Sequence, residues 1–314
     1  MNVLVTGSNG FVGRHLVRRL LRDGAVGPGR IARLTLVDLG HDPSLDDARV
    51  RRVTGSIADA AVLRQAFDKP VQQVFHLASV PGGAAEKHFA LGLEVNLHAT
   101  IAMLELLRAR QHAARFTFAS TIAVYGASLP PLVDDSTPMR PGLSYGAHKL
   151  AAEILVQDYS RRGWIDGRIL RLPGIVARPP EPSGLLSAFM SDIFWKLAAG
   201  EAFVCPVSAD AVAWWMSAPC CVDNLLHAAS LDPALAAQRR EYTLPVLRLR
   251  IGELVDALAA RFGADRHALV SYAPDAALEQ LFGRLPPLDA SAAEAIGLRH
   301  DGDVHRLIAN ATGL

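Results

Sequence analysis

The sequence has few of the residues that mark a specialised class of protein. It holds three cysteines in 314 residues, and 6% of its residues are aromatic. The cysteines are too few for a disulfide scaffold, and their positions do not match the spacing of a zinc site. We therefore expect no bound metal ion and a cytoplasmic protein with free thiols at Cys205, Cys220 and Cys221.

Charge of one sign is also scarce. The net charge is +1 at pH 7, with acids and bases interspersed, which argues against nucleic acid or an anionic membrane as the main partner. We expect no apolar run long enough to span a bilayer, and we expect that the chain opens on a strand rather than on a signal peptide. The composition is that of an ordinary globular protein, and the chain is long enough for one large domain or two coupled ones.

Strand and helix patterns alternate through the first half. Residues 2–6 form a continuous apolar strand, and apolar residues at helical spacing follow in 11–21. This alternation predicts an α/β fold with a doubly wound parallel Rossmann sheet. Further strands are expected at 34–37, 50–53, 74–78, 115–120 and 168–172, and helices at 59–67, 86–110 and 145–162.

A glycine motif links the first strand to its helix. Gly7 permits a tight turn, Gly10 lets the backbone approach a pyrophosphate, and Gly13 lets the helix pack close to the sheet. Asp38 ends the second strand, where it would accept hydrogen bonds from ribose hydroxyls and repel a 2′-phosphate, favouring NAD over NADP. The alternatives are that the glycines only make a turn and that Asp38 caps a helix or lies in a solvated turn.

A tyrosine and a lysine stand four residues apart downstream. Tyr145 and Lys149 share one helix face. Free tyrosine has a pKa of about 10, and a nearby ammonium together with a positive nicotinamide lowers it. Tyr145 is therefore the predicted general base and Lys149 its electrostatic partner, which also bonds the nicotinamide ribose. Alone, the pair could be an ordinary surface pair; with the glycine motif it predicts hydride transfer to or from a nicotinamide.

The pattern loosens after Pro173. Residues 179–184 are rich in proline and predict a loop. We expect an NAD-binding Rossmann domain over 1–173, with a return segment near 217–245, and a smaller C-terminal α+β substrate cap over 174–314. Within the second half we expect helices near 185–199, 222–230 and 251–262 and strands near 241–244 and 269–272.

Three motifs in order, Gly7-x-x-Gly10-x-x-Gly13, the segment 118–126 and Tyr145-x-x-x-Lys149, resemble the extended short-chain dehydrogenase/reductase family. That family includes nucleotide-sugar epimerases and dehydratases. The resemblance implies that Thr121 hydrogen-bonds the reacting oxygen, with its neighbour Ser120 as the second choice. It also implies cofactor contacts from Asn9, Phe11, Val12, Ser56, Ile57, Leu77, Ala78, Ser79, Asn96 and Pro173.

One position separates branches of the family. Nucleotide-sugar enzymes usually carry an Arg-x-x-Asn pattern whose asparagine contacts the substrate diphosphate, and here Gly174 stands at that position after Arg171. Segments 82–86, 144–149, 158–163, 170–176 and 204–206 resemble the D-erythronate dehydrogenase branch, nearly end to end. This implies NAD-dependent oxidation of a small polyhydroxy acid at a secondary alcohol, at C2, to the 2-oxo acid.

A sugar acid needs a cation for its carboxylate. Arg178 is the first candidate and Lys196 the second, and the alternative for Arg178 is a surface or cap salt bridge. Ser79 and Glu86 follow the fourth strand, on the side where open sheets bind ligands. The other predicted substrate contacts are Thr121, Tyr145 and Gly174.

Some positions depart from the resemblance. Residues 181–184 and 194–196 differ from the branch in segments that would shape the substrate pocket, and Ser56 stands where the family usually has an aspartate near adenine. Two other functions stay open: a nucleotide-sugar 4-epimerase or dehydratase with tightly bound NAD, and a cofactor-binding sensor without turnover. The family commonly dimerises through a four-helix bundle, so we expect a homodimer that uses 94–110 and 145–162.

Other notable side chains are expected to pack rather than react. His76 and Tyr125 are predicted to be buried near the site, and Trp214 and Trp215 to lie in the core or an interface. His148 points off the face shared by Tyr145 and Lys149, so we expect it to be exposed.

Overall fold

The structure is a computed structural model that describes residues 1–111, 113–180 and 185–313. The chain divides into two compact units. Unit 1 comprises Met1–Val124, Pro141–Arg171 and Val222–Thr243, and unit 2 comprises Tyr125–Arg140, Leu172–Cys221 and Leu244–Leu314. The expected proline-rich loop falls partly on 181–184, outside the described residues.

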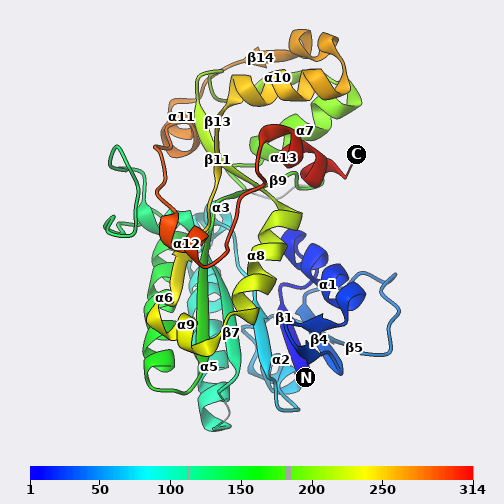
Figure 1. The fold of residues 1–314 in the computed structure, drawn as a ribbon, viewed down its shortest axis with the longest axis vertical. Helices are drawn as coiled ribbons and strands as arrows, with labels where there is room; N and C mark the ends of the chain where they lie inside the picture. Colours follow the sequence, from blue (N-terminus) through cyan, green and yellow to red (C-terminus); the bar gives the residue numbers. More distant parts are fainter. Residues whose placement is uncertain (112, 181–184, 314) are drawn as a thin grey trace. The chain divides into compact units, whose positions relative to one another are not determined.

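Unit 1 is built on a seven-stranded sheet in the order β12-β8-β7-β6-β1-β4-β5 (Figure 1). The pairings with a defined register run parallel. The chain moves outward from β1 and then returns to place β6 on the other side of β1, so the topological switch lies between those two strands. The doubly wound Rossmann sheet predicted from the sequence is confirmed. Its strands are β1 (Asn2–Thr6), β4 (Arg33–Asp38), β5 (Val50–Thr54), β6 (Gln73–His76), β7 (Arg115–Thr121), β8 (Asp166–Leu172) and β12 (Glu241–Thr243).

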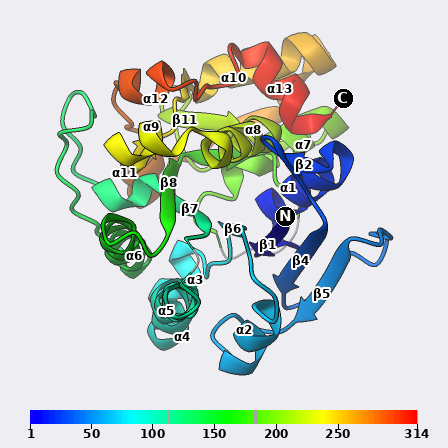
Figure 2. The ribbon, with the colours of Figure 1, turned by 60° about the horizontal axis from the view of Figure 1, so that its bottom comes forward.

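Apolar residues explain why these strands stay inside the unit. Val3, Leu4 and Val5 are almost wholly buried, as expected for a strand covered on both faces. Figure 2 shows α2, α5 and α6 on one face of the sheet and α1 on the other. The helices of unit 1 are α1 (Phe11–Asp23), α2 (Ala60–Ala66), α3 (Gly82–Lys87), α4 (Phe89–Leu93), α5 (Ala99–Ala109), α6 (Ser144–Arg161), most of α8 (Ala218–Ser230) and α9 (Pro233–Gln238), beside the hairpin β2 (Ala25–Val26) and β3 (Gly29–Arg30).

The single helix expected over 86–110 is interrupted in the structure. His88, with φ −126° and ψ 65°, separates α3 from α4, and a π-helical turn at Glu94–His98 joins α4 to α5. The joined stretch Phe89–Ala109 has 21 residues and a hydropathy of 1.3, so it is long and apolar enough to cross a membrane. Our expectation that no such run exists was wrong for the described residues. The inner helix of a globular domain meets the same two criteria, and Met103, Leu104 and Leu107 lie in the apolar core of unit 1.

Unit 2 mixes short strands and helices. Strands β9, β11 and β13 form one sheet, in which β11 runs antiparallel to β13 and parallel to β9, and β10 pairs in parallel with β14. Trp215 lies in its core and Trp214 is also buried, as expected. Its elements are β9 (Gly174–Val176), α7 (Phe189–Ala199), β10 (Phe203–Cys205), β11 (Val212–Ser217), β13 (Leu247–Arg250), α10 (Ile251–Phe262), the 3₁₀ turn Ala264–Leu269, β14 (Val270–Tyr272), α11 (Ala276–Phe282), α12 (Ser291–Ala295) and α13 (Val304–Thr312).

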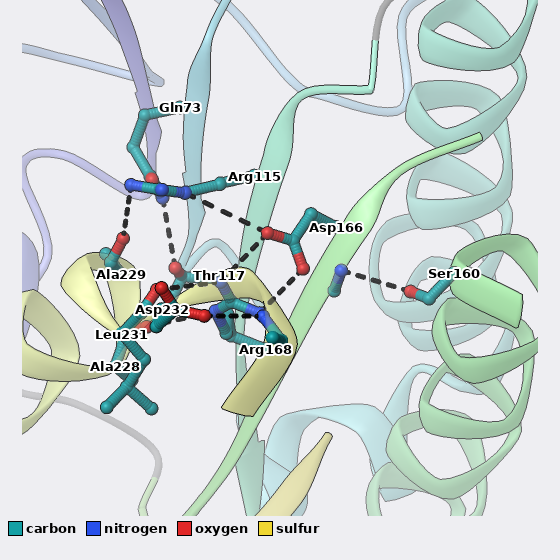
Figure 3. A network of polar contacts seen from close by, with 12 residues as sticks. Gln73, Arg115, Thr117, Ser160, Asp166, Arg168, Ala228, Ala229, Leu231 and Asp232 are labelled. Atoms are coloured by element: carbon teal, nitrogen blue, oxygen red, sulfur yellow. Dashed lines mark hydrogen bonds and ion pairs between the residues drawn. The ribbon is translucent and has the colours of Figure 1, made fainter. Parts of the chain in front are cut away.

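A buried polar network ties α8 to the sheet of unit 1. Figure 3 shows Arg115 and Arg168, from the neighbouring strands β7 and β8, pointing to Asp166. Arg168 donates to both carboxylate oxygens at 2.6 and 2.8 Å and to the carbonyl oxygen of Ala228 at 3.1 Å. Arg115 donates to the carbonyl oxygen of Ala229 at 3.2 Å. Guanidinium groups therefore satisfy carbonyls at the carboxyl end of α8, where cations are favoured.

Candidate active site

The glycine loop between β1 and α1 leaves no room for a side chain at Gly7 or at Gly13. Gly7 has φ +70°, and a Cβ on it would lie 2.6 Å from the backbone nitrogen of Ala78. A Cβ on Gly13 would lie 2.0 Å from the carbonyl oxygen of Gly7. Gly10 is exposed and precedes α1 with no side-chain cap. No side chain caps the first turn of α1, and the start of a helix favours an anion, so the cradle fits a dinucleotide pyrophosphate.

Asp38 connects the second strand to this loop. One carboxylate oxygen accepts from the backbone nitrogen of Asn9 at 2.7 Å, and the other accepts from that of Leu39 at 2.7 Å. Each oxygen retains a lone pair for a further donor. Asp38 thus lies beside the glycine loop at the carboxyl end of β4, as predicted. Of the loop residues named with it, Phe11 is buried and Val12 is half-buried.

The loop after β6 carries another group of predicted contacts. Leu77 and Ala78 are half-buried and Ser79 is exposed. Asn96 is almost wholly buried, and its amide accepts from the nitrogen of Val80 at 2.7 Å and donates to its carbonyl at 3.0 Å. Asn96 therefore holds the loop that Ser79 belongs to, and the π-helical turn presents it there. In the turn after the edge strand β5, Ile57 is buried and the hydroxyl of Ser56 accepts from the backbone nitrogen of Ala58 at 3.2 Å.

Helix α6 carries Tyr145 and Lys149 near its start. Glu86 holds that start: it accepts from the backbone nitrogen of Ser144 at 2.6 Å and from its hydroxyl at 3.1 Å. The Nζ atom of Lys149 lies 6.0 Å from the ring centroid of Tyr145, so the structure brings the two together. Glu86 acts here as a helix cap, a contact that the sequence did not predict.

Lys149 is enclosed by the sheet. The residue is 1% exposed, its Nζ donates to the carbonyl oxygen of Ala119 at 2.9 Å, and it lies 4.6 Å from the ring centroid of Phe118. Burial lowers the pKa of Lys149 to about 7, against an opposing effect of the Glu153 carboxylate. A buried ammonium with so few partners can stabilise an anion placed next to it.

The two hydroxyl candidates on β7 differ in their surroundings. Ser120 donates its hydroxyl to the carboxylate of Glu153. The hydroxyl oxygen of Thr121 accepts from the backbone nitrogen of Ala123 at 3.1 Å, which leaves its own hydrogen for another acceptor. The geometry therefore favours Thr121 over Ser120 for contact with a reacting oxygen.

Histidines near the site are structural. His76 is fully buried, with Nδ1 2.7 Å from the hydroxyl of Thr6 and Nε2 2.9 Å from that of Thr100. Burial, with the neighbouring Lys149 charge, holds the pKa of His76 well below its usual value. The expectation that His148 is exposed was wrong. It is 5% exposed and its ring lies 5.6 Å from that of Phe89, because α4 covers that face of α6.

The remaining predicted residues belong to unit 2. Pro173 is buried, Arg178 is half-buried, and the carbonyl oxygen of Arg178 accepts from the indole nitrogen of Trp195 at 2.7 Å. Lys196 is exposed and forms a 2.5 Å ion pair with Glu201. Lys196 thus already has an anionic partner within unit 2.

Gly174 stands on β9 in a place without room for a side chain. A Cβ there would lie 2.8 Å from the terminal carbon of Met190 and 2.9 Å from the carbonyl oxygen of Trp214. Within unit 2, an asparagine at this position would require β11 to move.

The sequence reasoning missed a buried ion pair behind Lys149. Glu153 and Arg171 lie 2.7 Å apart with side chains 0% and 4% exposed. The available signal was spacing: Glu153 follows Lys149 by four residues and so shares its buried helix face. A carboxylate on a buried face needs a partner, but the sequence does not show which arginine supplies it.

A profile of the NAD dependent epimerase/dehydratase family matches residues 3–214. The chain belongs to this family. Two D-erythronate dehydrogenases align with nearly all of it: that of Cupriavidus necator is 42% identical over 98% of this chain and 97% of its own, and that of Haemophilus influenzae is 31% identical over 98% of each.

Solved structures agree with the fold. A nucleoside-diphosphate-sugar epimerase from Agrobacterium tumefaciens superposes with a TM-score of 0.91 at 30% identity, over 98% of this chain and 92% of that one. A GalE-like L-threonine dehydrogenase from Cupriavidus necator superposes with a TM-score of 0.85 at 21% identity, over 100% and 99% of the two chains. This member of the epimerase/dehydratase family is an NAD-dependent oxidoreductase that uses a nicotinamide dinucleotide and acts on a small molecule.

Proposed function

We propose that the chain is a dehydrogenase of small polyhydroxy acids of the D-erythronate type, which it oxidises at C2 to the 2-oxo acid. The observation that carries the proposal is the pairing of Tyr145 with the buried ammonium of Lys149 in the same unit as a loop fitted to a pyrophosphate. The two D-erythronate dehydrogenases that align over nearly the whole chain support the choice of substrate class.

The proposed chemistry divides one alcohol oxidation between two acceptors. NAD, when bound, accepts the hydride that leaves the alcohol carbon. The phenolate form of Tyr145 takes the hydroxyl proton and becomes the neutral phenol. The charge of Lys149 stabilises that phenolate before the transfer, and Thr121 hydrogen-bonds the oxygen that becomes the carbonyl. The Lys149 ammonium suits this task because its burial keeps water from screening it.

We also propose NAD rather than NADP as the cofactor. Asp38 lies against the loop nitrogen of Asn9, where a ribose hydroxyl finds a carboxylate acceptor and a 2′-phosphate meets a negative charge. The residues proposed to line the cofactor are Gly7, Asn9, Gly10, Phe11, Val12, Gly13, Asp38, Ser56, Ile57, Leu77, Ala78, Ser79, Tyr145, Lys149 and Pro173, with Asn96 holding the loop of Ser79.

The substrate carboxylate requires a cation, and we propose Arg178 for this role. Its half-buried position suits an arginine that binds a ligand, whereas Lys196 is exposed and ion-paired to Glu201. We also propose that the substrate lies near Ser79, Gly174 and Glu86. Glu86 would act by accepting the hydrogen bond from the backbone nitrogen of Ser144 at the start of α6.

Each unit has a proposed role. Unit 1 would bind the cofactor and unit 2 would supply the substrate cap. We propose a homodimer through the helices at 94–110 and 145–162. Exposed apolar side chains support it: Ile154 lies on the second of these, and Phe89 and Leu91 lie on α4, just before the first. The cysteines Cys205, Cys220 and Cys221 form no disulfide, which fits the cytoplasm as the proposed compartment.

The Agrobacterium tumefaciens epimerase favours a second candidate, a nucleotide-sugar 4-epimerase or dehydratase. Gly174 counts against it, because the asparagine expected to hold the diphosphate would collide with Trp214 and Met190.

One experiment separates the two candidates. The protein is mixed with NAD or NADP and a panel of D- and L-aldonates of four to six carbons, and NADH formation is followed by absorbance. In parallel, binding of UDP- and GDP-sugars is measured by calorimetry. Net NADH formation with an aldonate supports the proposal; tight binding of a nucleotide sugar with no aldonate turnover replaces it with the second candidate.

A further inference from the structure

A buried ion pair lies behind Lys149 and takes no part in the proposed chemistry. The guanidinium of Arg171 donates through Nε to both carboxylate oxygens of Glu153, at 3.1 Å each, and through a terminal nitrogen at 2.7 Å. Both side chains are almost wholly buried. Charged groups are excluded from an interior unless each finds a partner, and this fork-shaped contact satisfies that need.

Three secondary-structure elements meet at this carboxylate. Glu153 comes from α6 and Arg171 from β8, and Ser120 donates its hydroxyl from β7. On α6, Glu153 follows Lys149 by four residues, just as Lys149 follows Tyr145. The three side chains therefore share one face of the helix, in the order base, ammonium, carboxylate.

When the charges of Glu153, Arg171, His76 and Lys149 are added, the positive charge of Lys149 is the one left unbalanced. Glu153 and Arg171 offset each other, and His76, which faces Lys149 from β6, is kept neutral by burial. From β7, Lys149 contacts the carbonyl oxygen of Ala119 and the ring of Phe118. A Glu153 carboxylate without Arg171 would instead bind the ammonium, since opposite charges attract strongly in an interior.

We propose that Arg171 and Ser120 hold Glu153 so that its carboxylate does not neutralise Lys149, which keeps the ammonium charge directed at Tyr145. The inference rests on the proposed function for its link to Tyr145. Glu153, Arg171 and Ser120 are positioning residues, because they act on the reaction through Lys149 and do not touch the substrate.

The proposal is tested on the protein without added cofactor or substrate. The chain has four lysines, Lys69, Lys87, Lys149 and Lys196, so a spectrum of protein labelled with ¹³C at the lysine ε-carbon has four signals to titrate. The variants are Glu153→Gln, Arg171→Met, the double variant and Ser120→Ala. Arg168→Met is the matched control, because Arg168 also forms a buried ion pair on β8.

The two charge variants, Glu153→Gln and Arg171→Met, are expected to shift the midpoint of the Lys149 titration in opposite directions. Glu153→Gln removes the carboxylate that favours the ammonium, so the midpoint of the Lys149 titration falls by about one pH unit. Arg171→Met releases the carboxylate toward Lys149, so the midpoint rises by about one unit. The double variant returns close to the wild-type value. Ser120→Ala raises the midpoint by less than Arg171→Met does, and Arg168→Met leaves it in place.

A merely structural role predicts other results. If Glu153→Gln and Arg171→Met leave the Lys149 midpoint where it is, or move it in the same direction, the proposal is overturned. Should the single charge variants not fold, Ser120→Ala carries the test, and an unmoved midpoint there overturns the proposal.

Activity adds a second readout. The pH profile of aldonate oxidation is expected to move with the Lys149 midpoint, while Ser120→Ala keeps most of the plateau rate. A loss of plateau rate of about 100-fold in Ser120→Ala with no shift would instead make Ser120 a substrate contact and overturn its positioning role. Shifted lysine signals without any aldonate turnover would support the ion-pair inference and overturn the proposed function, so the two failures are distinguishable.

Discussion

The Nζ atom of Lys149 donates a 2.9 Å hydrogen bond to the carbonyl oxygen of Ala119. This bond joins α6 to β7, and it fixes a buried ammonium 6.0 Å from the ring of Tyr145. The base and the hydroxyl of Thr121 therefore come from two elements that are locked together through the same lysine.

Tyr145→Phe is expected to lower the rate of aldonate oxidation by about 10²- to 10⁴-fold, because it removes the group that takes the hydroxyl proton. NAD affinity, followed by quenching of tryptophan fluorescence, is expected to stay within about twofold, since the ring remains. A rate within about tenfold of the wild type would remove Tyr145 from the proposed role.

Gly13→Ala is expected to abolish cofactor binding, because the added Cβ would meet the carbonyl oxygen of Gly7 at 2.0 Å. Gly142→Ala is the matched control, since a Cβ there has no atom within 4 Å. Calorimetric titration with NAD measures both. Equal NAD affinity in the two variants would contradict the close approach of α1 to the loop.

Asp38→Ala is expected to raise KM for NAD by about tenfold and to raise the ratio of NADP to NAD activity, because both the ribose acceptor and the repelling charge are lost. Asp46→Ala removes an exposed aspartate from the following loop and serves as the charge control. An unchanged cofactor ratio in Asp38→Ala would show that selectivity comes from elsewhere.

Arg178→Met is expected to raise KM for the sugar acid by about 10- to 100-fold, in line with the loss of a charged hydrogen bond. Lys196→Met should change KM little, because Lys196 is exposed and paired with Glu201. Comparing D-erythronate with its uncharged amide separates the contribution of the carboxylate: Arg178→Met should raise KM for the acid and leave KM for the amide unchanged. An equal rise in KM for both compounds would mean that Arg178 does not bind the carboxylate.

Lys149 should make stability depend on pH. Its pKa is about 7 in the folded protein, below the value of about 10.4 in an unfolded chain, so unfolding takes up a proton between these values. The destabilisation is full below pH 7 and fades as pH rises to about 10; across that window the wild type should gain roughly 4 kcal/mol relative to Lys149→Met. Urea unfolding of both proteins without cofactor at several pH values measures the gain, and parallel stability curves would contradict a buried ammonium.

Local patterns predicted much of unit 1. The strands β1 and β4 are short apolar runs. Gly7 and Gly13 stand where no Cβ fits, and a Cβ on Gly10 would lie 3.3 Å from the carbonyl oxygen of Gly7, so the glycine pattern in the sequence reflects the close packing of this loop. The Tyr145–Lys149 pairing also follows from helical spacing alone.

Features that depend on distant partners were not predictable. Strand β11 pairs with β9 and with β13, and its sequence has no clear alternation because it is buried. His148 is buried because Phe89 of α4 packs against it. The sequence pattern over 86–110 showed one long helix, so α4 could not be recognised as a separate helix that begins after His88. Likewise, Glu153 lies 33 residues from Ser120 and 18 from Arg171, a separation that no local period reveals.

The central claim is that a hydride leaves C2 of a small sugar acid while Tyr145 takes the proton. The most direct test uses D-erythronate deuterated at C2, with NAD, and follows the label by mass spectrometry. The proposed mechanism predicts one deuterium per NADH formed, with the 2-oxo acid as product and with transfer by Tyr145→Phe slowed by about 10²- to 10⁴-fold. NADH that carries no deuterium, or label retained in the acid while NADH forms, would contradict it.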